Sequence, residues 1–498
     1  MKKMKKIMAL ALSFMMVVAM SVATFAASTG GSGTSGSTTY TITAPSTNHK
    51  YEIYQIFTGD LDAVTGVLSN LKWGANGTGT AGEDVAQVVI TELTGVNSGT
   101  DFEKLEVIKK YADLASPLAT ITNGAAHTAT AGYYLIKDED GSLADKEDAY
   151  TLYIVEVVGD VTITPKSDIP SFEKKIKDTN DTTGVTSNWQ DSADYDIGDD
   201  IPFQLKGTVA DDYEDYQKYY FAFHDKEDRG LTFNPDSVKV YVDGIETTTG
   251  YNVETVLSDG CTFEIEFDDL KNISSVKAKS VITVEYTSKL NSDAVLGEQG
   301  NVNQARLEFS NNPNQTQFGT PETGKTPWDN VIVFTYKVEI NKVNEKTEPL
   351  AGAEFTLSKK LANGSTKNIA VVTNSAGTSF TFSGLDDGDY ILTETKTPSG
   401  YNTISPITFT VTADHDIEWT TQDRADVLTS LSGNKVTGEI SFTENKTEGS
   451  LSADVVNKSG STLPSTGGMG TTIFYVIGSV LVLGAAVLLI TKKRMSAR

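Results

Sequence analysis

The sequence lacks a second cysteine and is poor in histidine. Its 498 residues include one cysteine, Cys261, and four histidines. A single cysteine excludes an intramolecular disulfide, and its alternating surroundings, residues 261–265, favour a buried, inert thiol over a reactive one. The histidines are scattered without the spacing of metal ligands. Phosphate-binding glycine loops and nucleophile-elbow motifs are missing as well, so the sequence predicts no cofactor, no metal site and no external catalytic constellation.

Basic residues are also scarce, with 41 lysines and arginines against 66 aspartates and glutamates, a net charge of −25. A surface of this sign argues against nucleic acid as a partner. The acidic residues 211–215 form one cluster that could bind calcium. We interpret this cluster as a solvated acidic loop.

Long apolar runs are confined to the two ends of the chain. At the first end, four lysines precede an apolar run and small residues follow it, which predicts a secretory signal peptide over residues 1–26. Residues 27–39 are rich in glycine, serine and threonine and predict a flexible linker. At the other end, residues 471–490 are long enough to span a membrane, and the basic residues after them should stay on the cytoplasmic side.

A pentapeptide precedes the C-terminal apolar run. It consists of Leu463, Pro464, Ser465, Thr466 and Gly467. The pentapeptide, the apolar span and the basic tail together resemble the cell-wall sorting signal of Gram-positive surface proteins, whose motif is Leu-Pro-any-Thr-Gly. The alternative is a plain membrane anchor. The resemblance implies that a sortase, a cysteine transpeptidase, cleaves after Thr466 and joins its carbonyl to an amine. Residues 460–498 are therefore predicted to be a sorting signal.

The chain between these ends is long enough for about three domains. Residues 40–167, the first domain, combine alternating segments with two helical patterns and predict an α+β fold. Residues 168–335 and 336–459, the second and third domains, contain short alternating strands bounded by turns, which is typical of β-sandwiches. The sequence thus predicts a mainly β protein with tandem Ig-like sandwiches and a C-terminal transmembrane helix.

In the third domain, three strands carry a polar residue on an otherwise apolar face. These residues are Lys342, Glu394 and Asn457, each two positions after an apolar residue. Burial favours the neutral form of both a lysine and an acid, so the amine could attack the asparagine amide while the protonated acid assists. Convergence of the three would allow an intramolecular isopeptide bond. A buried salt bridge with an asparagine hydrogen bond is the alternative.

The second domain shows the same pattern with a less certain acid. Lys174 lies on the apolar face of the first strand, and Asn303 shares a face with apolar residues of a late strand. Asp225 continues an apolar face and is the acid that we favour. Asp196 and Asp199 are the alternatives.

Each domain also resembles part of the sortase-assembled major pilins of Gram-positive bacteria. Residues 51–59 and 68–74 resemble their N-terminal domain, and the second domain resembles their A-type isopeptide domain. The third domain resembles the B-type repeat of collagen-binding adhesins, an Ig-like module that ends many pilins. The resemblance implies two isopeptide bonds, Lys174–Asn303 with Asp225 as catalyst and Lys342–Asn457 with Glu394 as catalyst.

A lysine between the first and second domains matches the pilin motif of this family. In the family a lysine follows a strand ending in Tyr-Pro-Lys-Asn, and residues 161–167 place Lys166 in register with it. The segment departs from the motif at Thr164, Ser167 and Val157, which replace an aromatic residue, an asparagine and a tryptophan. The resemblance implies that Lys166 is the acceptor amine; an ordinary solvated lysine is the alternative.

Together these features resemble a backbone pilin of the SpaA type, the shaft subunit of a pilus polymerised from Thr466 to Lys166 of the next subunit. The resemblance implies a pilin-specific sortase, identical subunits, minor tip or base pilins and peptidoglycan as partners. It also implies a cell-wall or fimbrial location and no enzymatic activity beyond self-formed isopeptide bonds. The alternative function is a monomeric wall-anchored adhesin that binds a host or partner-cell surface; a wall-anchored enzyme is disfavoured by the missing motifs.

Overall fold

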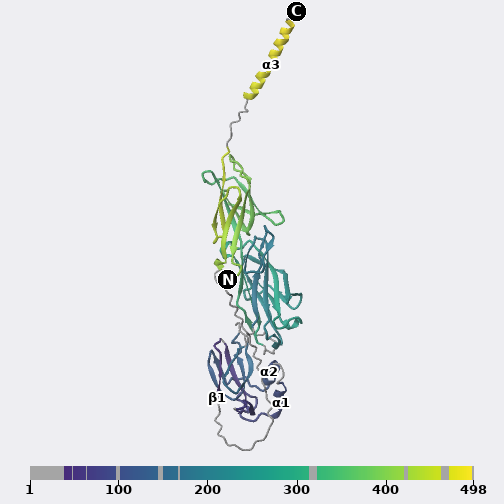
Figure 1. Cartoon of the computed structure of the whole chain (residues 1–498), viewed down its shortest axis with the longest axis vertical. Helices are drawn as coiled ribbons and strands as arrows, with labels where there is room; N and C mark the ends of the chain where they lie inside the picture. Colours follow the sequence, from purple (N-terminus) through teal and green to yellow (C-terminus); the bar gives the residue numbers. More distant parts are fainter. Residues whose placement is uncertain are drawn as a thin grey trace, which may run out of the picture.

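The computed structural model describes most of the three domains and the C-terminal helix. The described residues are 39–47, 49–62, 64–96, 101–143, 150–165, 169–312, 322–419, 424–460 and 470–495. The predicted signal peptide, Lys166 and the pentapeptide 463–467 lie outside them. Three β units are stacked along the long axis, and helix α3 lies at one end (Figure 1). The predicted fold class, mainly β with Ig-like sandwiches and a C-terminal apolar helix, is confirmed.

The first domain packs two small sheets and two helices around two apolar clusters. The sheets have the strand orders β5-β1-β8 and β3-β2-β6-β7, with β4 beside β2. Val89 and Leu93 of α1 join Tyr54 of β2 in one cluster, so the helices cover a sheet face. The elements are β1 (Thr39–Thr43), β2 (Lys50–Leu61), β3 (Leu68–Trp73), α1 (Gln87–Gly95), α2 (Asp101–Lys109), β4 (Ala119–Thr122), β5 (Ala126–Thr130), β6 (Gly132–Asp138), β7 (Leu152–Val157) and β8 (Val161–Thr162).

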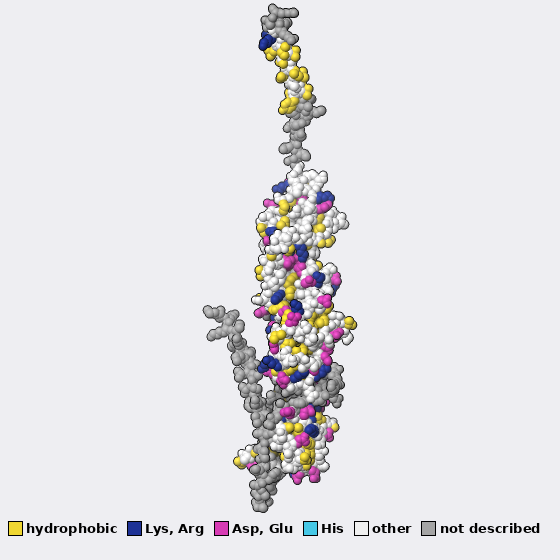
Figure 2. Space-filling model, turned by 90° about the vertical axis from the view of Figure 1, so that its right-hand side faces the viewer, with side chains coloured by type: hydrophobic (Ala, Val, Ile, Leu, Met, Phe, Trp, Pro, Cys, Tyr) yellow, Lys and Arg dark blue, Asp and Glu magenta, His cyan; other side chains and the backbone are white. Residues whose placement is uncertain are grey.

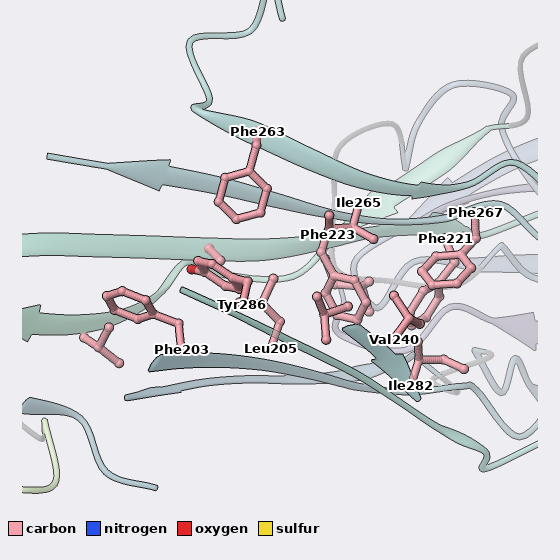
Figure 3. Close-up of a cluster of buried hydrophobic side chains, with 14 of the residues drawn as sticks. Phe203, Leu205, Phe221, Phe223, Val240, Phe263, Ile265, Phe267, Ile282 and Tyr286 are labelled. Carbon is pink, nitrogen blue, oxygen red and sulfur yellow. The ribbon is translucent and has the colours of Figure 1, made fainter. Parts of the chain in front are cut away.

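The second domain is a sandwich of two sheets, β12-β22-β20-β14-β18-β17 with β21 beside β20, and β16-β15-β19-β13-β9. Both sheets contribute aromatic side chains to one core, where the Tyr286 ring lies 5.3 Å from Phe203 and 4.9 Å from Phe263 (Figure 3). Because β9 is an edge strand of the second sheet, its inward residues line the end of this core.

The second domain contains the following elements. They are β9 (Ser171–Ile176), β10 (Thr179–Asn180), β11 (Val185–Thr186), β12 (Ser192–Asp194), β13 (Asp200–Thr208), β14 (Phe221–Glu227), β15 (Leu231–Val242), β16 (Ile245–Thr247), β17 (Asn252–Glu254), β18 (Phe263–Phe267), β19 (Val281–Leu290), β20 (Asn301–Ser310), β21 (Thr323–Lys325) and β22 (Asp329–Phe334), with short 3₁₀ turns at Tyr213–Asp215, Leu270–Asn272 and Gly297–Gln299.

The third domain is a second sandwich, with sheets β26-β27-β23-β32-β31 and β25-β24-β28-β29-β30. Its first strand, β23, pairs in parallel with its last, β32, so that Lys342 lies opposite Val455. This pairing brings the start and end of the domain side by side. The elements are β23 (Tyr336–Asn344), β24 (Glu354–Lys360), β25 (Thr366–Ile369), β26 (Val371–Thr373), β27 (Ser379–Leu385), β28 (Gly388–Lys396), β29 (Ile407–His415), β30 (Leu428–Thr437), β31 (Phe442–Asn445) and β32 (Ser450–Asn457), with a 3₁₀ turn at Arg424–Asp426.

The second and third domains meet in a packed junction. The carboxylate of Asp191 accepts a hydrogen bond from the Trp419 amide at 2.8 Å. Gly297 and Gly449 pack backbone against backbone, since a Cβ on Gly297 would lie 2.4 Å from the Gly449 nitrogen. Both glycines have positive φ, 76° and 61°, which other residues rarely adopt. The junction is therefore a specific contact between the two domains.

Helix α3 (Gly470–Met495) contains an apolar segment, Phe474–Lys493, with a mean hydropathy of 2.4. Its length and composition suit a membrane span, and its side chains are exposed, as the yellow surface at the top of Figure 2 shows. The predicted C-terminal apolar helix is thus confirmed.

Cys261 differs from its prediction, because it is half-buried rather than buried. Strand β18 begins only at Phe263, so Cys261 lies in the turn before it. There its Sγ lies 3.0 Å from the carboxylate of Asp259, which also contacts His224 at 3.1 Å. Burial raises the pKa of the Cys261 thiol, which favours the unreactive thiol form.

Candidate functional site

Lys174 is fully buried in the second domain. It lies on β9, opposite Leu205 of β13, and points into the sandwich as the alternation of apolar residues requires. Its ammonium nitrogen lies 5.4 Å from the ring centres of both Phe203 and Tyr286. The lysine is therefore removed from water in an aromatic core, and this burial disfavours its charged form.

The hydroxyl of Tyr286 joins Lys174 to the other polar groups of this core. The Lys174 amine contacts the Asp225 carboxylate at 2.5 Å and the Tyr286 hydroxyl at 2.8 Å. The hydroxyl donates to Asp225 at 2.7 Å and accepts from the Asn303 side-chain amide at 3.0 Å. Amine, acid and amide thus converge on one oxygen atom.

Burial shifts these groups toward their neutral forms. It lowers the pKa of Lys174, although the Asp225 charge acts in the opposite direction, and it raises the pKa of Asp225 against the attraction of Lys174. Burial and then the Asp225 charge raise the pKa of neighbouring Glu227 to about 8. The buried oxygens Asn303 Oδ1 and Asp225 Oδ1 accept no hydrogen bond from the described residues. Burial therefore brings the pKa values of the amine and the acid closer together, which makes the neutral pair more accessible than it would be in water.

The two alternative acids lie elsewhere. Asp196 and Asp199 face Lys367 of the third domain at 3.1 and 3.2 Å, and the structure brings only Asp225 of the three beside Lys174. Sequence reasoning missed Tyr286, because it alternates with apolar residues of β19 and is indistinguishable there from an ordinary core aromatic.

Lys342 of the third domain is also fully buried, but its amine contacts carbonyl groups rather than a carboxylate. The amine donates to the Val455 carbonyl at 2.7 Å and to the Val343 carbonyl at 3.0 Å. Burial lowers the pKa of Lys342 to about 8, with the Glu394 charge acting in the opposite direction. A substantial fraction of this lysine is therefore neutral near physiological pH.

Asn457 and Glu394 lie in direct contact in the same core. The Asn457 amide donates to the Glu394 carboxylate at 3.1 Å and to the Asn402 carbonyl at 2.8 Å. The same Glu394 oxygen accepts from the Ile404 amide at 3.1 Å, which fixes the orientation of the acid. The other oxygens, Glu394 Oε1 and Asn457 Oδ1, are buried without a hydrogen-bond partner among the described residues.

A third buried lysine, Lys359, was not predicted, although Phe355 and Leu357 alternate with it on β24. It is fully buried at the junction of the second and third domains and lies 2.7 Å from Asp386 and 3.4 Å from Asp196. Burial alone would lower its pKa, but these carboxylates outweigh burial and raise it. Lys359 is therefore a charged structural residue.

Two segments of the chain match known families. Residues 336–425 match the SpaA prealbumin-like fold domain, and residues 455–496 match the LPXTG cell wall anchor motif. The first match covers strands β23 to β29, which carry Lys342 and Glu394, and the second covers the end of β32 with Asn457, the pentapeptide and α3.

Longer matches extend over most of the chain. The trypsin-resistant surface T6 protein of Streptococcus pyogenes is 26% identical over 398 residues, which are 67% of this chain and 70% of that protein. The solved T6 backbone pilin of S. pyogenes covers 86% of this chain and all of its own, with a TM-score of 0.51 and 19% identity. The full-length major pilin SpaD of Corynebacterium diphtheriae covers 85% of this chain and 97% of its own, with a TM-score of 0.48 and 16% identity.

Proposed function

Because the chain resembles the backbone pilins of Gram-positive bacteria and carries a cell-wall anchor, we propose that it is the shaft subunit of a covalent pilus. The observation that carries the proposal is the arrangement of the molecule. Three β domains lie in a line with the membrane helix at one end (Figure 1). Two of the domains bury a lysine, an acid and an asparagine in one core.

Polymerisation would join the two ends of successive subunits. A pilin-specific sortase breaks the Thr466–Gly467 peptide bond, holds Thr466 as a thioester and releases the amine of Gly467. The amine of Lys166 in the next subunit attacks the thioester, forms an amide and frees the enzyme. The first domain, whose strand β8 ends four residues before Lys166 in the sequence, lies at the opposite end of the molecule from α3 (Figure 1). Head-to-tail growth follows, minor pilins join the tip or base, and a final transfer attaches the fibre to peptidoglycan.

Substitution of Lys166 tests this proposal. In cells that express the sortase, we expect Lys166→Ala to abolish the polymer ladder on denaturing gels while monomer continues to reach the surface. Lys289→Ala, which changes a half-exposed lysine of the second domain, is the matched control and should keep the ladder. A persistent ladder in Lys166→Ala would mean that another amine is the acceptor. If the unmodified protein itself is anchored to the wall only as a monomer and gives no ladder, the adhesin alternative is favoured.

In the third domain, the neutral amine of Lys342 would form a bond with the side-chain carbonyl carbon of Asn457. Glu394, hydrogen-bonded to the amide nitrogen of Asn457, transfers a proton to that nitrogen as the carbon–nitrogen bond breaks and ammonia leaves. The amine proton of Lys342 returns to Glu394, so the acid is regenerated.

In the second domain, Lys174 and Asn303 would form the corresponding bond with Asp225 as the acid, and the Tyr286 hydroxyl lies between Asp225 and the Asn303 amide nitrogen. Tyr286 holds amine, acid and amide together through its hydroxyl group. Each bond would close a loop of more than 110 residues between early and late strands of its domain. Pulling force would then bypass most of each sandwich.

The intact mass of the ectodomain, residues 27–466, tests both bonds. Each isopeptide bond releases one ammonia, so we expect the mass to lie about 34 Da below the sequence mass, or about 17 Da for each bond. Lys174→Met and Lys342→Met should each remove one of the two losses, and peptide mapping should locate the remaining bond. A full sequence mass in the unmodified protein would contradict both bonds and leave the buried groups as salt bridges and hydrogen bonds.

A further inference from the structure

Carboxylates from two domains gather where β12 meets the turn between β27 and β28. One oxygen each of Asp194, Asp386 and Asp387 lies within 4.8 Å of the others. Asp194 ends β12 of the second domain and is 2% exposed, whereas Asp386 in the turn of the third domain is 0% exposed. Almost 200 residues separate Asp194 from Asp386, so no local sequence motif predicts this group of carboxylates.

Two oxygens of this group have no hydrogen-bond donor. Asp194 Oδ2 and Asp386 Oδ1 are both buried and unpartnered among the described residues. The second oxygen of Asp386 accepts from Lys359 at 2.7 Å, and Asp387 accepts from Asn180 at 2.5 Å. A buried carboxylate oxygen without a donor is unfavourable, so a further positive group is expected between Asp194 and Asp386.

The lysines and the histidine nearby do not balance the charge. Lys359 divides its contacts among Asp386, Asp196 and Asp181, and Lys367 contacts Asp196 and Asp199. The described charged groups that face one another here are Lys359, Lys367 and His415 on the basic side, and Asp178, Asp181, Asp194, Asp196, Asp199, Asp386 and Asp387 on the acidic side. The buried hydroxyl of Tyr336 also faces Asp194, but it carries no charge to balance these carboxylates. Burial, followed by the charges of Asp387 and Asp178, raises the pKa of Asp194 to about 7. Seven carboxyl groups thus face three basic groups here, and their crowding makes it unfavourable for all of them to be ionised together.

We propose that Asp194, Asp386 and Asp387 bind a calcium ion that bridges the second and third domains. The donors are all carboxylates, which hard divalent cations prefer, and an oxygen spacing of up to 4.8 Å fits two ligands on opposite sides of a calcium ion at about 2.4 Å each. The ion would satisfy both unpartnered oxygens. It would also tie β12 to the β27–β28 turn and make the junction stiffer.

Calcium titration of the purified ectodomain, residues 27–466, tests the site. After chelator treatment, we expect calorimetry to show one calcium ion bound per chain with a Kd of about 10⁻⁴ to 10⁻³ M, the range of extracellular calcium modules. Calcium at 10 mM should raise the unfolding temperature by about 5 °C. Asp194→Asn and Asp387→Asn should each weaken binding by about tenfold or more.

Two controls make the result decisive. Asp387 is only half-buried, so Asp387→Asn tests the site even if Asp194→Asn disturbs folding, which circular dichroism would detect. Asp211→Asn changes the acidic loop at residues 211–215 and should leave calcium binding unchanged. If Asp211→Asn abolishes binding, or if both junction variants bind like the unmodified protein, the ion belongs elsewhere and the proposal is wrong.

A proton shared between Asp194 and Asp386 is the competing explanation. Because the folded pKa of Asp194 is raised to about 7 from 3.8, such a proton would stabilise the fold at low pH and be lost as pH rises through about 7. Stability that falls between pH 6 and 8 without any response to calcium would overturn the calcium proposal. A response to calcium that disappears in Asp387→Asn would support it.

Discussion

Lys342 and Lys359 lie in the same domain and are equally buried, yet their environments give them opposite properties. Lys342 contacts backbone carbonyls, and burial lowers its pKa to about 8. Lys359 contacts the carboxylates of Asp386 and Asp196, which raise its pKa. Burial removes water from both amines, but the neighbouring groups decide whether the amine is a nucleophile or a fixed charge. The predictions below test this difference.

Removal of the acid beside Asn457 should have the largest effect. We expect Glu394→Ala to prevent the Lys342–Asn457 bond, so that the mass of the ectodomain lies only about 17 Da below the variant's own sequence mass instead of about 34 Da. By analogy with disulfides that close loops of this length, the third domain should lose about 4–5 kcal/mol of unfolding free energy. Mass spectrometry and denaturant unfolding measure the two effects.

The matched control for this variant is Glu354→Ala, which removes an exposed partner of Lys396 from the same sheet. It should form the bond and change stability by less than about 1 kcal/mol. If Glu394→Ala still loses both ammonia molecules, Glu394 does not assist the bond.

Removal of Lys359 should destabilise the protein without changing its mass deficit, which is the difference between the sequence mass and the measured mass. Lys359→Met leaves buried Asp386 without its cation and Asp196 with Lys367 alone, and breaking a buried ion pair in this way costs about 3–5 kcal/mol. Denaturant unfolding should show the loss, while both ammonia losses persist in the intact mass. A mass deficit that shrinks in Lys359→Met would show that Lys359, rather than a predicted lysine, forms a bond.

When the isopeptide bond is absent, the low pKa of Lys342 should make the unfolding free energy depend on pH. In Asn457→Ala, between about pH 8 and 10.5, the unfolded chain binds more protons than the folded one, so stability should rise with pH across this window. Below about pH 8 both forms are protonated and this gain is absent. The double variant Lys342→Met with Asn457→Ala should lack the slope; equal slopes in the two proteins would refute the lowered pKa.

Removal of the hydroxyl of Tyr286 should have the smallest effect on stability but should discriminate between the domains. Tyr286→Phe removes the contacts to Lys174, Asp225 and Asn303 and should cost about 1–2 kcal/mol. Formation of the second-domain bond should slow by at least about tenfold, while the third-domain bond forms normally. Mass spectrometry after synthesis over a time course measures both rates; equal slowing would assign Tyr286 a general folding role.

The sequence predicted the orientation of individual side chains well where one strand sufficed. Alternation with apolar neighbours placed Lys174 and Lys342 inward, and both are fully buried. The same rule applied to Lys359 would have found it, because Phe355 and Leu357 precede it on the same face. Cys261 was misjudged because the pattern did not show that β18 starts two residues later.

The sequence by itself determined the β character of each sandwich, the inward lysines and the C-terminal anchor motif with its apolar helix, because these follow from local periodicity and composition. Only the tertiary structure decided which acid lies beside Lys174, how Tyr286 joins three polar groups, and how Asp194 meets Asp386. Those contacts depend on which strands pair and on how two domains pack. A periodic pattern specifies the face of a strand, but it does not specify the residue that the face will meet.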